Sequence, residues 1–359
     1  MPYLKKLLLL CVAFSSPLLA QIIDLEETPT PCVIQSKQII LPNFPYAFNP
    51  SLIKWEGSFL LCFRAGKEYR YDDEIPIHSE DFFDYDYVDK YSPNRIGLVW
   101  LDENLNPCST PQILNIPNYN STYRQQDPRL VVVGNRIFIV YSDIVKGMYI
   151  DYTRRMCTAE LFIENGNFYV RDTACLTAFD GAKETLWEKN WVPFDYEDNL
   201  MLAYSLTPHK ILYPLLNSGV CSTIAVTNKK ANWGWGVLRG GTPAVLINDQ
   251  EYLSFFHSSC VLESVQSGGK KMQHYFMGAY TFAAQPPFEL KRISPAPVIG
   301  KNFYNGPKYK TWKPLIVVFP GGIVEEKDHF LVAYGRQDHE IWITKIDKTG
   351  LLDSLICVQ

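Results

Sequence analysis

Apolar residues in this chain recur in pairs of short runs, and a tight polar turn separates the two runs of each pair. Five pairs begin beside a proline and end about 14 residues later, which is the length of a β-hairpin. The prolines are Pro50, Pro128, Pro193, Pro243 and Pro320. Turns such as Glu56-Gly57 and Gly134-Asn135 hold residues that favour tight hairpins. The pattern therefore predicts five hairpins.

Each hairpin is followed by another strand-like run, such as RIGLVWLD or CTAELFIE. Five repeats of about four strands predict an all-β fold, a five-bladed β-propeller. The run after Cys32 and the run EIWITKID are expected to complete one blade together. A β-sandwich built from repeated hairpins is the alternative. The propeller is favoured because polar residues recur where each first run starts and each second run ends, and a propeller gathers these positions around one axis.

The first twenty residues resemble a secretory signal peptide. Lys5 and Lys6 precede a short apolar stretch, and Ala20 is a suitable small residue before a cleavage site. The alternative is an uncleaved anchor. We therefore predict a signal peptide over 1–20, a single propeller domain over 21–359, and export from the cytoplasm. No later segment reaches 18 apolar residues, so no membrane span is expected in the mature chain.

Composition narrows the possible partners. The formal net charge is −4, which argues against nucleic acid as a partner, and aromatic residues make up 14% of the chain, as expected for many short strands. Eight cysteines follow Cys11, and none forms a CxxC pair. The sequence thus predicts no metal site, while an even cysteine count in an exported chain permits disulfides.

The polar positions predicted at the axis carry mixed charge: Asn49, Arg64, Asp127, Arg129, Asp143, Lys189, Asn190, His209, Arg239, Thr242, His257, Arg336 and Asp338. Paired donors and acceptors suit the hydroxyl groups of a sugar, and flat rings suit its apolar faces. Candidate rings are Trp187, Trp191, Trp233, Trp235, Tyr304 and Trp312. A glycan is therefore the expected ligand.

An ordered set of motifs also resembles a known family. QDPRL at 126–130, KNWVPF at 189–194, RGGTPAV at 239–245 and AYGRQD at 333–338 are similar to glycoside hydrolase family 130. That family contains β-mannoside phosphorylases and β-1,2-mannosidases on a five-bladed propeller. The resemblance implies an enzyme that cleaves a mannoside by general-acid catalysis.

Position by position, the resemblance implies a role for each matching residue. Asp127 matches the catalytic acid, and such an acid needs a raised pKa, which burial favours and a pairing with Arg129 opposes. Phosphate-binding positions are matched by Lys189, His209 and Arg239. Sugar-binding positions are matched by Asn49, Arg64, Asn94, Arg95 and Asp338, and His257 matches a donor position. The strand-end pattern adds Arg129, Asp143, Asn190 and Thr242 as substrate-binding candidates.

The second reactant stays open at this stage. A phosphorylase needs fixed cations for phosphate, whereas a hydrolase needs a carboxylate base and room for water. The basic residues favour phosphate, although His209 stands where the phosphorylases are expected to have arginine, and export favours water. The alternatives are a β-mannosyltransferase with the same pocket and a glycan-binding propeller without catalysis. No cofactor is predicted beyond inorganic phosphate as a possible co-substrate.

Residues 68–91 contain nine acidic residues and five tyrosines. This segment could be a lid over the pocket, an acceptor-sugar loop or a weak Ca²⁺ site at Asp84, Asp86 and Asp89. The alternative is a solvated insertion between strands.

Overall fold

The computed structural model describes residues 22–66, 94–117, 124–146, 153–216, 218–309 and 314–359. The predicted signal peptide, the acidic segment 68–91 and Trp312 lie outside these residues. Within the described ranges, no helix has the length and apolar character needed to cross a membrane.

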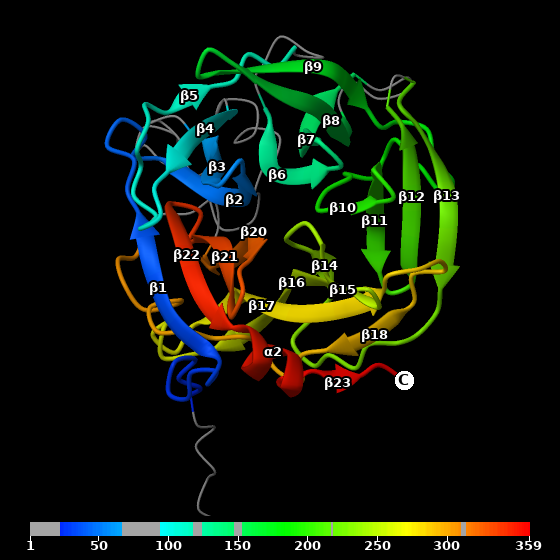
Figure 1. Cartoon of the computed structure of the whole chain (residues 1–359). Helices are drawn as coiled ribbons and strands as arrows, with labels where there is room; N and C mark the ends of the chain where they lie inside the picture. Colours follow the sequence, from blue (N-terminus) through cyan, green and yellow to red (C-terminus); the bar gives the residue numbers. More distant parts are fainter. Residues whose placement is uncertain (1–21, 67–93, 118–123, 147–152, 217, 310–313) are drawn as a thin grey trace, which may run out of the picture.

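The strands form sheets that stand around a common axis (Figure 1). One four-stranded sheet contains β2 (Ala47–Trp55), β3 (Ser58–Ala65), β4 (Arg95–Leu101) and β5 (Gln112–Ile113). The next contains β6 (Gln126–Val133), β7 (Arg136–Val145), β8 (Thr153–Glu164) and β9 (Asn167–Cys175). A third contains β10 (Val192–Tyr196), β11 (Asn199–Leu206), β12 (His209–Leu215) and β13 (Val220–Thr227). The all-β propeller arrangement is confirmed.

The remaining two sheets differ in size. A seven-stranded sheet contains β14 (Arg239–Gly240), β15 (Val245–Asn248), β16 (Glu251–Glu263), β17 (Lys271–Ala283), β18 (Leu290–Ile293), β19 (Leu315–Ile316) and β23 (Ile356–Cys357). The last four-stranded sheet contains β20 (Val318–Glu325), β21 (His329–Arg336), β22 (Glu340–Asp347) and β1 (Val33–Ile39). A short helix, α2 (Lys348–Ser354), follows β22. The prediction of five equal four-stranded repeats is therefore correct for four sheets and wrong for the seven-stranded one.

The seven-stranded sheet departs from the pattern at its first strand and at its edges. Pro243 lies in a break between β14 and β15, and both of these short strands pair with β16. The equivalent prolines of the other sheets lie inside their strands, so this break is particular to the seven-stranded sheet. β17 and β18 then recruit β19 and β23 as additional strands.

Apolar side chains fill the spaces between neighbouring sheets. One core cluster joins Phe63 of β3 to Ile343 of β22, and another joins Val140 of β7 to Leu202 of β11. β1 pairs antiparallel with β22, as predicted, with Ser36 opposite Thr344. The first described strand thus completes the last sheet and closes the ring.

Two of the innermost strands, β2 and β6, are irregular at their prolines. The ladder shifts register between Phe48 and Ser51 in β2, and between Gln126 and Arg129 in β6. Such bulges re-aim side chains and are common beside active sites. In each case the residue before the proline is the one whose side chain is redirected.

Candidate active site

Asp127 lies in the bulge of β6 and is held by residues of the preceding sheet. Asn49 donates from Nδ2 to Asp127 Oδ1 at 2.9 Å, and the Arg64 guanidinium lies 3.2 Å from the same oxygen. The Asp127 side chain is 12% exposed, and that of Arg64 is 8% exposed. The carboxylate is therefore ion-paired but keeps one open side.

The backbone at this point adopts an unusual conformation. Asn49 has φ of 46° and Asp127 has φ of 52°, and each precedes the proline of its own repeat. Asn and Asp tolerate the left-handed region better than other non-glycine residues, and strained residues gather at functional sites. The two sheets therefore present equivalent residues to one another.

Glycine at position 335 makes room for this pair. A Cβ atom on Gly335 of β21 would lie 2.2 Å from Asn49 Oδ1, which is closer than real atoms approach. Because Gly335 of the last sheet has no side chain, Asn49 has room to lie against Asp127.

The charges around Asp127 decide its ionisation. Burial raises the pKa of Asp127, but Arg64, Lys189 and Arg129 together lower it more, and the Asn49 hydrogen bond acts in the same direction. The net result is a pKa well below the ordinary range for Asp. The opposing effect expected from Arg129 is thus present, and with Arg64 and Lys189 it outweighs desolvation. The raised pKa that an acid needs when substrate binds stays a prediction.

Arg129 is buried and joins the inner strands. Its guanidinium donates to the carbonyls of Asp127 at 3.0 Å and Pro128 at 3.1 Å, and also to the carbonyl of Gly241. The Phe319 ring lies 5.1 Å from the guanidinium. Burial lowers the pKa of Arg129 to about 10, so it stays charged at neutral pH. Arg129 thus acts through charge and backbone contacts.

Lys189 approaches the same region from the segment before β10. Its ammonium donates to Gln126 Oε1 at 2.9 Å, one residue from the carboxylate. Its charge contributes to the lowered pKa of Asp127. Arg64 on the other side donates from Nε to Asn94 Oδ1 at 2.8 Å. Cations from three sheets or their connections therefore converge on Asp127.

His257 and Arg239 lie beside Arg129 and Asp127. They are paired residues on β16 and β14. Burial lowers the pKa of His257 to about 3, and the charges of Arg129 and Arg239 act in the same direction. His257 is therefore neutral at physiological pH and can serve as a hydrogen-bonding group, whereas Arg239 is exposed and charged.

Tyr275 of β17 is a candidate residue that the sequence reasoning missed. Its ring is stacked on His257 with centroids 6.0 Å apart. Burial raises its pKa, the carboxylates of Asp338 and Asp127 raise it further, and Arg239 lowers it. Tyr275 therefore lies within the electric fields of all three charged residues. Met277 pairs with His257 in the ladder, and Tyr275 lies two positions before Met277 on the same face of β17. A search of the strand predicted opposite His257 could therefore have identified Tyr275.

Asp338 lies just after β21 and is half-buried, with φ of 53°. Its turn is fixed by Arg336, whose buried guanidinium pairs with Glu340 at 2.5 Å, and by Gln337, which hydrogen-bonds to Val317. The turn therefore has little freedom, and Asp338 is held on the Tyr275 side of the site.

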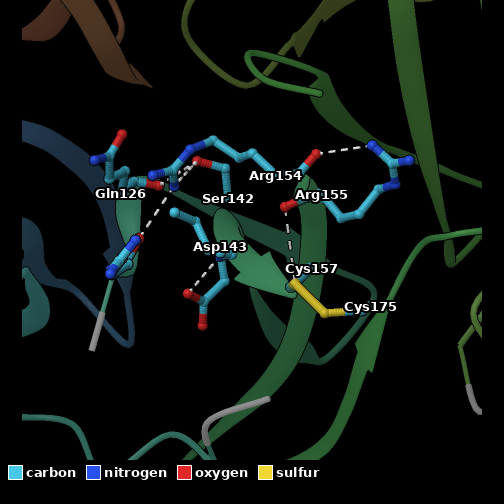
Figure 2. Close-up of a disulfide and its surroundings, with 9 residues drawn as sticks. Gln126, Ser142, Asp143, Arg154, Arg155, Cys157 and Cys175 are labelled. Carbon is cyan, nitrogen blue, oxygen red and sulfur yellow. Dashed lines mark hydrogen bonds between the residues drawn. A yellow bond between two sulfur atoms is a disulfide. The ribbon is translucent and has the colours of Figure 1, made fainter. Parts of the chain in front are cut away.

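Asp143 is buried on β7, next to Ser142, which pairs with Gln126 of β6 (Figure 2). Its Oδ1 accepts from the Ile144 amide at 2.7 Å. Burial raises the pKa of Asp143 to about 6, and Arg154 and Arg124 oppose this rise. Asp143 is thus protonated more readily than Asp127.

Several other predicted residues have structural contacts. Thr242 accepts from the Phe255 amide at 2.9 Å, and Asn190 has φ of 64° beside Gly240. Arg95 is exposed at the start of β4. Among the six predicted rings, Trp187 is 37% exposed, whereas Trp191 is buried.

The structure does not bring His209 to the predicted phosphate group. Its Nδ1 lies 2.7 Å from the Phe288 carbonyl, and its ring packs against Tyr280 and Phe282. Burial lowers its pKa to about 4, so the ring is neutral. No contact of the described residues joins His209 to Lys189 or Arg239, so we leave it out of the site.

No group of three or more His, Cys, Asp or Glu side chains among the described residues is placed to hold a metal ion.

Comparison with protein families finds no matching family model, and no curated protein matches the sequence. Solved structures do match. A β-1,2-mannobiose phosphorylase from Listeria innocua, solved with β-1,2-mannobiose, has a TM-score of 0.56 at 15% identity and covers 93% of this chain and 99% of its own. A mannose phosphorylase from Leishmania mexicana, solved with phosphate, has a TM-score of 0.56 at 13% identity and covers 91% and 92%.

A glycosyl hydrolase from Bacteroides ovatus matches with a TM-score of 0.57 at 13% identity, covering 91% of this chain and 94% of its own. The chain has the fold of mannoside-active enzymes. The fold expected from the resemblance to glycoside hydrolase family 130 is thus found in structures whose sequences differ greatly from this one.

Proposed function

We propose that this chain is an exported enzyme that cleaves a β-mannoside by phosphorolysis, with Asp127 as the general acid. The observation that carries the proposal is an excess of cations at the site. Arg64 and Arg129 already act on Asp127, and Lys189 adds a third positive charge. Arg239 adds a fourth beside His257. Fixed cations are what a phosphate co-substrate requires, whereas a hydrolase needs a second carboxylate poised as a base. Export is inferred from the signal-peptide pattern over 1–20.

In the proposed reaction, the bond between the anomeric carbon and the glycosidic oxygen breaks. A phosphate oxygen forms the new bond to that carbon, and the leaving sugar oxygen receives the proton from Asp127. The products are mannose 1-phosphate and the shortened sugar. Lys189 and Arg239 are assigned to the phosphate, and Arg64, Asn49 and Asp338 to the sugar hydroxyls.

The low pKa of Asp127 is compatible with this role only if the ligand changes it. A bound phosphate dianion offsets the charge of Lys189 and Arg239, and the sugar displaces water from the open side of the carboxylate. Both effects raise the pKa of a carboxyl group. We therefore propose that Asp127 takes up its proton when the two substrates bind.

The structural neighbours support the same class of substrate, since one was solved with β-1,2-mannobiose and another with phosphate. With the seven-stranded sheet counted as a blade, the ring would have the five blades that the resemblance implies.

The test is a screen of manno-oligosaccharides with and without inorganic phosphate, measuring mannose 1-phosphate and free mannose. Mannose 1-phosphate that depends on phosphate is expected, with Lys189→Ala and Arg239→Ala raising the KM for phosphate. Lys229→Ala is the control, because that lysine is 37% exposed and pairs with Glu289 at 3.1 Å, away from Asp127. Free mannose regardless of phosphate would identify a hydrolase. Activity only in synthesis, from a mannosyl donor other than mannose 1-phosphate, would identify a transferase. Sugar binding without turnover would identify a binding protein.

A further inference from the structure

The segment from Lys183 to Lys189, which we call the cation arm, brings Lys189 to the site without belonging to a sheet. Lys189 contacts Gln126, and the Trp187 ring lies 5.9 Å from the Lys189 ammonium. The Arg154 guanidinium lies 5.4 Å from the same ring. A lysine on an irregular segment needs other contacts to hold its position, since its own side chain has many rotamers.

Those contacts come from β8. Arg155 is 3% exposed, and it donates from its guanidinium to the Leu186 carbonyl at 2.6 Å and the Lys183 carbonyl at 2.9 Å. Thr153 donates to the Glu184 carbonyl at 2.7 Å. Two adjacent positions of one face of β8 therefore hold three carbonyl groups of the cation arm.

The end of the cation arm is tied to the same strand. The Glu188 amide donates to the Arg154 carbonyl at 3.0 Å. The Glu188 side chain accepts from Trp191 Nε1 at 3.2 Å and is buried. Glu188 is thus buried, whereas Lys189 next to it contacts Gln126 beside Asp127.

β8 is itself a rigid support. Cys157, two residues after Arg155, forms a disulfide with Cys175 directly opposite on β9 (Figure 2). The Leu176 amide, where the chain leaves β9 toward the cation arm, donates to the Met156 carbonyl at 2.8 Å. The connection between β9 and β10 is thus hydrogen-bonded near both of its ends to β8, the strand that carries Arg155.

We propose that Arg155 is a positioning residue: by holding the carbonyls of Lys183 and Leu186, it fixes Lys189 beside Gln126 and sets the affinity of the site for its anionic reactant. The inference rests on the proposed function for the identity of that anion. Arg155 itself contacts no substrate. Two hydrogen bonds from one planar group fix direction as well as distance, which a lysine cannot reproduce in full.

The test measures binding of inorganic phosphate to the full chain by calorimetry, together with the KM values for phosphate and sugar. Arg155→Met is expected to weaken phosphate binding by about 10-fold, the order expected for a lost charge-assisted contact, with little change in the KM for sugar. Arg155→Lys should recover part of the loss. Arg171→Met on β9 is the matched control, because this arginine is 59% exposed and pairs with Glu160.

A double-mutant cycle separates positioning from general destabilisation. In a Lys189→Ala background, Arg155→Met should have no further effect on phosphate binding, because the residue it positions is gone. Additive losses, or unchanged phosphate binding in Arg155→Met, would overturn the proposal. If Arg155→Met fails to fold, Thr153→Val, which removes one tether, takes its place in the same cycle.

Failure of the proposed function and failure of the positioning role give different results. A wild type that binds no phosphate and releases free mannose would contradict phosphorolysis. The cycle is then run on kcat/KM for the sugar, where additivity of the Arg155 and Lys189 variants would still overturn the positioning role.

Discussion

The ion pair between Arg64 and Asp127 gives a quantitative test of the electrostatics of the site. Its atoms are 3.2 Å apart, and its side chains are 8% and 12% exposed. Two unit charges at this distance interact by about 5 kcal/mol at an effective dielectric constant of 20. Because Lys189 and Arg129 remain, we expect Arg64→Gln to remove about 3 kcal/mol of this stabilisation, which equals a rise of about 2 units in the pKa of Asp127.

The sign of the pH dependence follows from the lowered pKa. A carboxyl group with a folded pKa below its unfolded value of about 3.9 stabilises the fold above that value, and the stabilisation is lost as the pH falls through the folded pKa. Arg64→Gln brings the two pKa values together. The unfolded pKa is the same for both proteins, so the destabilisation caused by the substitution should be full at pH 7. It should shrink as the pH falls through the folded pKa of the variant, which lies about 2 units above that of the wild type.

Urea denaturation of both proteins at pH 7, 4 and 2 measures this difference. A free-energy difference that is the same at pH 7 and pH 2 would refute the reasoning. Lys54→Gln is the matched control: Lys54 pairs with Glu326 at 2.6 Å, but the side chains are 43% and 24% exposed. That surface pair should contribute less than about 1 kcal/mol.

Three further predictions concern the same region. Asp127→Asn should lower kcat by about two to four orders of magnitude with a smaller effect on KM, and normal turnover would remove Asp127 from the mechanism. The His257 ring should show no titration by NMR between pH 5 and 8, since its pKa is lowered to about 3; an inflection near 6.5 would contradict its burial. Activity should survive a chelator, and a loss restored by Zn²⁺ or Ca²⁺ would reveal a metal requirement.

Sequence pattern predicts the hairpins well because continuous apolar runs and turn chemistry are local properties, and the strands are buried along most of their length. It also predicts the pairing of β1 with β22, since an incomplete last repeat needs a strand from elsewhere. It does not predict β19 and β23, which are two residues long each and carry no periodicity. Those strands exist only because β17 and β18 present edges to them.

The site is partly predictable for the same reason. Equivalent positions of the repeats identify Asn49 and Asp127, which contact each other. His209 is misplaced because the predicted second run of its hairpin ends there, whereas β11 stops at Leu206 and His209 begins β12. The direction of the Asp127 pKa shift is a sum over cations from separate sheets, and only their distances determine which effect is larger.

The seam between β1 and β22 has a consequence for how the protein folds. Its residues are about 300 apart along the chain, so closing it costs on the order of 5 kcal/mol of chain entropy. Contacts of such high contact order form late. The sheet that this seam completes carries Asp338 and the Gly335 that seats Asn49. We therefore expect the protein to become active only when β1 pairs with β22 and closes the ring. A partly folded chain with most of its hairpins in place would still be inactive.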